Sequence, residues 1–314
     1  MIETSAVLAI GIDNRVDFCR ELKGSGERPS AKERQEAALL KLTVLDGLAR
    51  AVEDGVPKAN VVLWADADLG EGALLKARAV SFEVAVSMEK PGPLPAGLSL
   101  DATADAWSLI TKLNAKFAAV RVGYNFADPA PVKQNVQEHL RMLASRCRDA
   151  GKQLAIELAP SASLEQTTAA VGTAISALRA QLVIEAMREL QDASIEPAVW
   201  VCVPPLDELA AATVAAQAHV DDRKSVTVWF EVGAEINPGR ITPGPSREDR
   251  SLVRLAARVV GVGGVLVGPD AYFSTLTRLH QGLIGREAAV QAIAGYVRKV
   301  WDLYTATKRA SGIA

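Results

Sequence analysis

Five carboxylates each stand at the end of a short apolar run, and three cations stand beside or among them. Carboxylates gathered at one place must be offset by cations, by a metal or by raised pKa values. Such an arrangement is typical of catalytic sites. Asp13 and Glu157 are the strongest candidates, because each follows an apolar run and needs a partner inside the fold. The carboxylates are Asp13, Asp66, Glu89, Glu157 and Glu231, and the cations are Arg15, Lys90 and Arg121.

The elements that must position these side chains are eight short apolar runs, separated by enough chain for a helix each. Short strands that alternate with helices indicate repeated βαβ units and a parallel sheet. Eight such units close into a (β/α)8 TIM barrel, in which the chemistry sits at the carboxyl ends of the strands. We therefore predict an α/β fold with a single (β/α)8 barrel domain over residues 1–314. The predicted strands are Val7–Asp13, Asn60–Asp66, Phe82–Glu89, Ala119–Asn125, Gln153–Ala159, Ala198–Pro204, Val226–Gly233 and Gly261–Gly268.

The clearest helix signals are two capping residues. Ser30 precedes the predicted helix Ala31–Glu53, and Glu33 is placed to complete a capping box. Ser246 begins another helix, with an acidic residue in the first turn. The stretch 161–192 is long for one unit, and it predicts a short helix or irregular segment before the helix Gln181–Gln191. The other predicted helices are Glu71–Ala79, Ala102–Asn114, Val132–Ala150, Leu206–His219 and Arg286–Lys308.

Nucleophiles and metal-binding side chains give few signals. Among the lysines, Lys90 falls near a strand end, where it is expected to pair with a carboxylate rather than attack a substrate. The histidines His139, His219 and His280 lie in predicted helices and lack metal-ligand spacing. Cys202 has no histidine placed to activate it, so we expect a core thiol.

Composition and charge narrow the range of partners. The chain has 314 residues, 49% of them hydrophobic, and a formal net charge of -2 without a basic patch, which argues against nucleic-acid binding. No apolar stretch approaches the length of a membrane span. Three widely spaced cysteines favour a reducing compartment. We expect a cytoplasmic protein with a small-molecule ligand and without membrane or nucleic-acid partners, and the sequence is compatible with a homo-oligomer.

The last predicted strand contains the glycines Gly263 and Gly264 and ends at Gly268. In (β/α)8 barrels, the loops after strands seven and eight often bind phosphate through backbone N–H groups. Glycine also relieves crowding where helices pack against a barrel. Phosphate binding and close packing therefore both stay open at this end of the chain.

Short segments at the strand ends carry a family resemblance. They are Gly11–Arg15 with Phe18, Trp64–Gly70, Met88–Gly92, Val120–Asn125, Ile156–Leu158, Glu189–Asp192 with Glu196–Trp200, and Gly285–Ala288. In their order and spacing the chain resembles the class I, tagatose-bisphosphate-aldolase-like barrels. The resemblance is strongest to the aldolase-like domain found with the 5-dehydro-2-deoxygluconokinase of inositol catabolism, and it spans nearly the whole chain.

The resemblance implies a (β/α)8 fold and aldol cleavage of a keto-sugar phosphate through a lysine imine. The residues that match the family are Asp13, Arg15, Glu89, Asn125 and Glu157. Three positions depart from it. The imine-forming lysine of strand six is Val201, and the strand-four lysine is Arg121, which stays protonated. The phosphate-binding arginine after Gly268 is Pro269, which also lacks a backbone N–H.

Three functional hypotheses follow. In the first, the chain is an aldolase-like lyase or isomerase acting on a small keto-sugar, polyol or keto-acid, with altered chemistry. Asp13 and Glu157 would move protons, and Arg121 would hold an oxyanion. In the second, the carboxylates bind a divalent metal that polarises a carbonyl, and no other cofactor is expected. In the third, a non-catalytic relative binds a ligand or partner. The residues expected to bind substrate are Arg15, Asp66, Glu89, Lys90, Asn125, Glu231 and Gly268.

Overall fold

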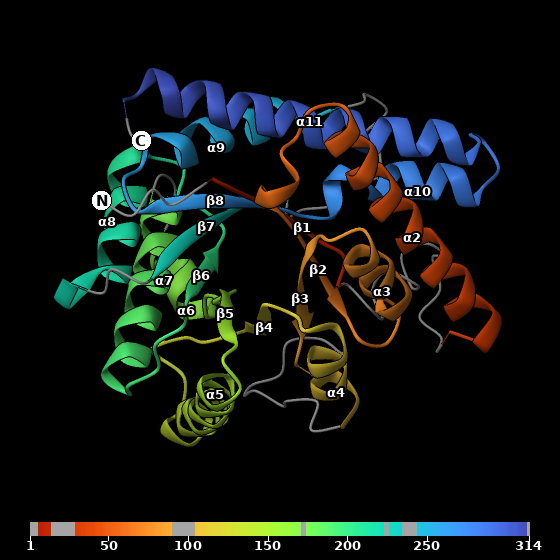
Figure 1. The fold of residues 1–314 in the computed structure, drawn as a ribbon. Helices are drawn as coiled ribbons and strands as arrows, with labels where there is room; N and C mark the ends of the chain where they lie inside the picture. Colours follow the sequence, from red (N-terminus) through yellow and green to blue (C-terminus); the bar gives the residue numbers. More distant parts are fainter. Residues whose placement is uncertain are drawn as a thin grey trace.

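Eight parallel strands form a closed barrel in the order of the chain (Figure 1). The computed structural model describes residues 6–13, 29–89, 104–170, 174–222, 226–233 and 244–312. Each strand is paired with the next, and β8 pairs with β1 to close the ring. The predicted (β/α)8 barrel is therefore confirmed. The strands are β1 Val7–Gly11, β2 Val61–Asp66, β3 Glu83–Ser87, β4 Phe117–Val122, β5 Gln153–Leu158, β6 Val199–Cys202, β7 Thr227–Val232 and β8 Val262–Val267.

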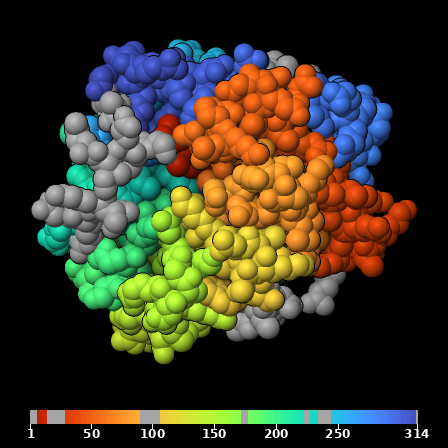
Figure 2. Space-filling view, viewed as in Figure 1, coloured from red at the N-terminus to blue at the C-terminus, as the bar shows by residue number. Residues whose placement is uncertain are grey.

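Helices surround the barrel, and in Figure 2 those that follow β1 to β4 cover one side of it in chain order. No helix in the described ranges is long and apolar enough to cross a membrane. Short 3-10 turns occupy Lys58–Asn60, Val220–Asp222 and Pro269–Ala271. The α-helices are α2 Ala31–Glu53, α3 Glu71–Ala79, α4 Ala104–Leu113, α5 Ala130–Asp149, α6 Leu164–Ala169, α7 Ala174–Asp192, α8 Glu208–Ala218, α9 Arg247–Arg258, α10 Phe273–His280 and α11 Arg286–Ala310.

The capping signals of the sequence appear in the structure. Ser30 and Glu33 form the predicted capping box at the start of α2, and Ser246 and Asp249 form one at the start of α9. For 161–192 the sequence predicted a short helix or irregular segment before a longer helix, and the structure confirms this order with α6 followed by α7. The long helix α7 begins at Ala174, seven residues before the predicted Gln181, because the intervening residues are also compatible with a helix.

Strand β4 ends earlier than predicted, at Val122 instead of Asn125. Asn125 turns the chain, because its side-chain oxygen accepts from the N–H of Ala127 at 2.9 Å and its own N–H donates to Asp128 at 3.0 Å. Such local hydrogen bonds compete with continuation of a strand. The turn places residues after β4 outside the ladder, where they contact neighbouring helices.

The core has two parts, as the period of two in a strand requires. Apolar side chains of one parity pack against the helices, and those of the other parity fill the barrel. In the interior, Phe117 and Trp229 meet edge to face with ring centroids 5.5 Å apart. The interior cluster consists of Ala9, Val62, Trp64, Ala85, Phe117, Ala119, Ala155, Val199, Val201, Trp229 and Leu266. Toward the carboxyl ends of the strands, the positions that face the barrel interior become polar. These polar side chains gather at the opening formed by the carboxyl ends of the strands, here called the mouth.

The barrel is closed by its last elements. Helix α11 packs across both α2 and α9 (Figure 1). At the seam between β8 and β1, Gly264 lies opposite Val7, and a Cβ at Gly264 would meet the Val7 carbonyl oxygen at 2.5 Å. This contact explains Gly264 as a close approach of two strand backbones, which differs from the predicted crowding between helices and the barrel.

Candidate functional site

A buried carboxylate and a half-exposed arginine form the centre of the mouth. Glu157, on β5, is 5% exposed, and its Oε1 lies 2.9 Å from Nε of Arg121, on β4. The two strands run side by side in this register, so the pair is fixed by the sheet. Arg121 keeps 49% of its side chain exposed, so part of its guanidinium faces the space above the barrel. The Glu157 carboxylate is thus buried inside the barrel, and the Arg121 guanidinium is accessible to solvent.

A second buried carboxylate, Glu231 on β7, lies near the same arginine. Burial raises the pKa of Glu231 from 4.5 to about 7, because Arg121 offsets only part of the desolvation penalty and Asp13 adds repulsion. The pKa of Glu157 is also raised well above its usual value, chiefly by burial, with Arg121 opposing the change. In return, Glu157 and Glu231 raise the pKa of Arg121, which stays a cation. The pKa values of both buried carboxyls are therefore raised above their usual range, and that of Glu231 lies close to neutral pH.

Asp13 reaches the mouth from the end of β1. The Ser87 hydroxyl donates to Asp13 Oδ2 at 3.3 Å, and the Trp64 indole N–H donates to Ser87 Oγ at 2.9 Å. This chain of hydrogen bonds links three neighbouring strands. Sequence reasoning missed Ser87, although its parity with Ala85 in β3 would have identified it as an inward residue.

Glu89 follows β3 and accepts from the backbone N–H of Arg121 at 3.3 Å. Its charge also contributes to the raised pKa values of Arg121 and Glu157. The structure therefore gathers four of the five predicted carboxylates, Asp13, Glu89, Glu157 and Glu231, around Arg121.

The fifth carboxylate, Asp66, has partners within the fold. Its Oδ2 lies 2.5 Å from Nζ of Lys41, on α2, and both side chains are buried. Its Oδ1 accepts from the N–H of Leu69 at 2.5 Å and from that of Gly70 at 3.4 Å. These contacts fix the turn from β2 into α3, so we leave Asp66 out of the proposed site.

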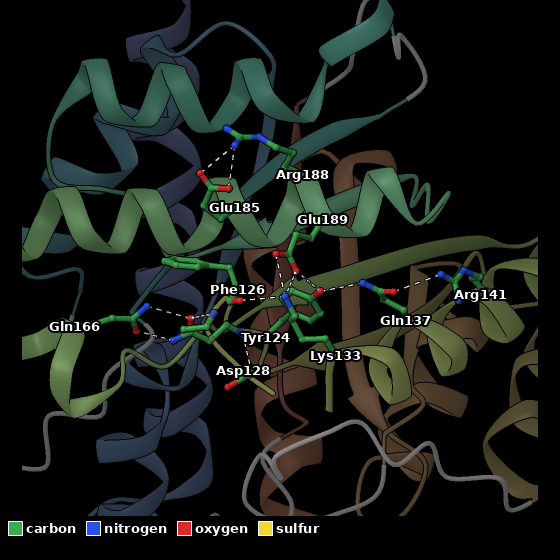
Figure 3. Close-up of polar contacts among 12 residues, drawn as sticks. Tyr124, Phe126, Asp128, Lys133, Gln137, Arg141, Gln166, Glu185, Arg188 and Glu189 are labelled. Carbon is green, nitrogen blue, oxygen red and sulfur yellow. Dashed lines mark hydrogen bonds and ion pairs between the residues drawn. The ribbon is translucent and has the colours of Figure 1, made fainter. Parts of the chain in front are cut away.

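Asn125 also holds loops together. Its amide donates to the Ser161 carbonyl at 2.9 Å and to Gln166 Oε1 at 2.7 Å, which ties the chain after β4 to α6. Beside it, Tyr124 donates to Glu189 of α7 at 2.7 Å, and Lys133 of α5 binds the same carboxylate at 3.0 Å (Figure 3). This network lies between helices and positions the loops around the mouth. We therefore assign Asn125 a positioning role.

Position 201 lies in the barrel interior, where Val201 of β6 is fully buried next to Glu157 in the register of the sheet. Among the described lysines only Lys41 is buried, and it comes from helix α2. Gly268 follows β8, and its N–H donates to the Val232 carbonyl at 2.8 Å. The predicted substrate-binding residues Arg15 and Lys90 lie outside the described residues.

Solved structures similar to this chain share its barrel. An archaeal fructose 1,6-bisphosphate aldolase is 12% identical, with a TM-score of 0.55 over 97% of this chain and 96% of its own. A Schiff-base-forming fructose-1,6-bisphosphate aldolase is 11% identical, with the same score and coverage. The fructose-bisphosphate aldolase of Slackia heliotrinireducens is 11% identical, with a TM-score of 0.55 over 96% of this chain and 86% of its own. At these identities the likeness is one of fold.

The closed ring of eight parallel strands defines this protein as a (β/α)8 barrel. Residues 2–228 match the family described as "Uncharacterized protein conserved in bacteria (DUF2090)", and the chain belongs to that family. No curated protein matches the chain. The finer resemblance to tagatose-bisphosphate-aldolase-like barrels stays a prediction.

Proposed function

We propose that this protein is an aldolase-like lyase or isomerase that acts on a small keto-sugar, polyol or keto-acid by proton transfer. The observation that carries the proposal is the pair of buried carboxyls, Glu157 and Glu231, that share Arg121 at the mouth. A carboxyl whose pKa is about 7 can both take and give a proton at neutral pH. Glu157, whose pKa is also raised, and a fixed cation beside both carboxyls suit reactions that pass through an enolate.

In the proposed reaction, one carboxylate takes a proton from the substrate. The proton comes either from a carbon next to the carbonyl, which leaves an enolate, or from the hydroxyl on the second carbon from the carbonyl. In the second case the hydroxyl oxygen forms a new carbonyl as the carbon–carbon bond breaks, and the other fragment is left as an enolate. Negative charge then develops on the carbonyl oxygen. The exposed part of the Arg121 guanidinium is placed to stabilise that oxygen. In the lyase reaction the other carboxyl gives its proton to the enolate carbon. In the isomerase reaction it gives the proton to the former carbonyl carbon, and the hydroxyl proton passes from one oxygen to the other, so that atoms and charge balance.

The residue at position 201 supports a route without an imine there. Valine has no amine, and its side chain is buried in the interior cluster. We therefore propose that proton transfer through the carboxyls replaces covalent catalysis at this position. Borohydride reduction in the presence of a keto-sugar tests this directly: mass spectrometry is expected to find no adduct on any lysine. An adduct on Lys90 or Lys41 would restore the imine mechanism.

The metal-dependent alternative has less support. Within the described ranges, no group of three or more His, Cys, Asp or Glu side chains is arranged to hold a metal ion. If a metal is nevertheless the cofactor, Mg²⁺ or Mn²⁺ should raise the melting temperature, and Glu157→Gln should abolish the rise.

The decisive experiment is hydrogen exchange. Keto-sugars that raise the melting temperature are incubated with the protein in D2O, and deuterium at the carbon next to the carbonyl is followed by NMR. Glu157→Gln and Glu231→Gln should each slow the exchange about a hundredfold or more. The control Glu138→Gln changes an exposed residue of α5 and should leave the rate unchanged. Exchange that survives both mouth variants would refute these roles, and a stabilising ligand without any exchange would favour the non-catalytic alternative.

A further inference from the structure

The outward face of helix α9 carries a row of four arginines, all of them exposed. They follow one another at intervals of three, four and four residues, so they lie within an arc of about 80° on a helix of about 3.6 residues per turn. The acidic residues of α9 stand in its first turn, where Asp249 is buried in the capping box and Glu248 is exposed. The arginines, here called the α9 row, are Arg247, Arg250, Arg254 and Arg258.

The α9 row has no counter-charge within the described part of the chain. Arg250 donates to the Pro245 carbonyl at 2.8 Å, and none of the four arginines forms an ion pair with a described residue. Like charges three or four positions apart destabilise a helix, and a cation in the first turn opposes the helix dipole. The row therefore lowers the stability of α9, and an anion bound from outside would relieve the repulsion.

The neighbouring helices do not neutralise the row. Helix α11 packs along α9 (Figure 1), and from Arg298 onward it contains one carboxylate, Asp302, which lies 3.6 Å from Nε of Arg298. Helix α8, which precedes α9 around the barrel, carries one charged residue, Glu208, at its first position. The cations of this part of α11 are Arg298, Lys299, Lys308 and Arg309. The fold thus joins two distant segments into one basic surface, although the formal net charge of the chain is -2.

The chemistry of the row favours the phosphates of a duplex. A planar guanidinium binds a phosphate through two parallel hydrogen bonds, whereas lysine acts as a point charge. At about 1.5 Å per residue the row spans about 16 Å, over which one strand of a DNA duplex carries about five phosphates. The exposed side chains of α9 are all polar, so the helix offers no aromatic ring for the bases of a single strand and no apolar side chain for a lipid bilayer.

We propose that the α9 row binds the phosphate backbone of double-stranded DNA without regard to base sequence. Phosphate contacts fix a protein on a duplex but carry no sequence information. The row lies on the outer wall of the barrel and uses none of the residues of the mouth, so this inference does not depend on the proposed function. It departs from the expectation of no nucleic-acid partner, which rested on net charge and on the spacing of cations along the sequence.

The test is fluorescence anisotropy of the full chain with labelled duplexes of about 20 base pairs, at several salt concentrations. Four phosphate contacts predict a slope of about -3.6 for the logarithm of the binding constant against that of the salt concentration. Affinity should then fall about a hundredfold between about 50 and 200 mM salt, and two unrelated sequences should bind equally. Arg254→Gln should make the slope shallower by about one, and glutamine at all four positions of the row should weaken binding at about 50 mM salt by about a hundredfold or more.

A matched control removes the same charge elsewhere. Glutamine at four exposed cations outside α9 and α11 should leave the slope unchanged, and circular dichroism checks that each variant is folded. The control positions are Lys32, Lys58, Lys112 and Arg148.

Three results would overturn the inference. The first is a dissociation constant above about 1 mM for the duplex at about 50 mM salt. The second is duplex binding that the control variant weakens as much as the α9 variants do. The third is a preference for vesicles containing phosphatidylserine, or for a single strand of the same length, that is lost with the α9 row. A preference for the duplex that is lost only with the α9 row supports the inference.

Discussion

Glu231→Gln should stabilise the protein at alkaline pH and leave its stability nearly unchanged in acid. The pKa of Glu231 rises from 4.5 to about 7 on folding, chiefly by burial. Below pH 4.5 the carboxyl is protonated in both states and the pKa difference contributes nothing. Between pH 4.5 and about 7 the unfolded chain gives up its proton first, so the free energy of unfolding falls as pH rises. Above about pH 7 the penalty is constant.

The size of this penalty follows from the two pKa values. They differ by about 2.5 pH units, and one unit corresponds to about 1.36 kcal/mol, so ionised Glu231 costs about 3 kcal/mol. Glutamine has a similar shape and no charge, so the variant should escape this cost. Loss of the Glu231 charge also relieves repulsion on Glu157, which acts in the same direction. The free energy of unfolding of the variant, relative to that of the wild type, should therefore rise by about 3 kcal/mol as pH increases from 4.5 to about 8.

The assay is urea unfolding followed by tryptophan fluorescence, since the interior Trp64 and Trp229 report on the barrel. The quantity of interest is the difference in free energy of unfolding between variant and wild type as a function of pH. Glu138→Gln, on the surface of α5, should show a small and flat difference. If the curve for Glu231→Gln is equally flat, Glu231 does not hold its proton in the folded state, and the assignment of a proton-transfer role to it fails.

Three further substitutions test the surrounding contacts. Arg121→Gln removes the cation that pairs with Glu157. Because Arg121 is half exposed, the same unfolding assay should show a free energy of unfolding lower by only about 1 kcal/mol at about pH 8, and by less in acid. Lys41→Met leaves Asp66 buried without its cation and should cost about 3–5 kcal/mol, whereas the double variant with Asp66→Asn should recover part of this loss in a double-mutant cycle. Gln166→Ala removes the contacts of α6 with Asn125 and should speed amide hydrogen exchange in α6 without lowering the global free energy of unfolding by more than about 1 kcal/mol.

The barrel and the orientation of most mouth residues were predictable from local patterns. Apolar runs separated by helix-length segments specify the strands, and the period of two directs Arg121, Glu157 and Glu231 to the interior side. The caps at Ser30 and Ser246 are equally local, because a capping box involves residues only three positions apart.

The partners of the remaining residues were not predictable in this way. Asp66 shares the parity of Trp64, yet its charge is met by Lys41, which lies 25 positions away in sequence and on a helix. Asn125 is bound by Gln166, 41 positions away. Such contacts depend on how helices pack against the barrel, and neither periodicity nor charge spacing encodes that. The same holds for Ser87, whose role depends on its neighbours in two other strands.

The contact between Gly264 and Val7 bears on how the chain is made. A ribosome delivers β1 first and β8 last, so the two edges of the sheet stay without partners until nearly the whole polypeptide has emerged. The final joining step then needs two backbones to meet at a distance that leaves no room for a methyl group. With alanine at position 264, the added methyl group would collide with the Val7 carbonyl oxygen and hinder closure of the barrel. The open edges of the sheet would then be exposed to strands of a neighbouring chain.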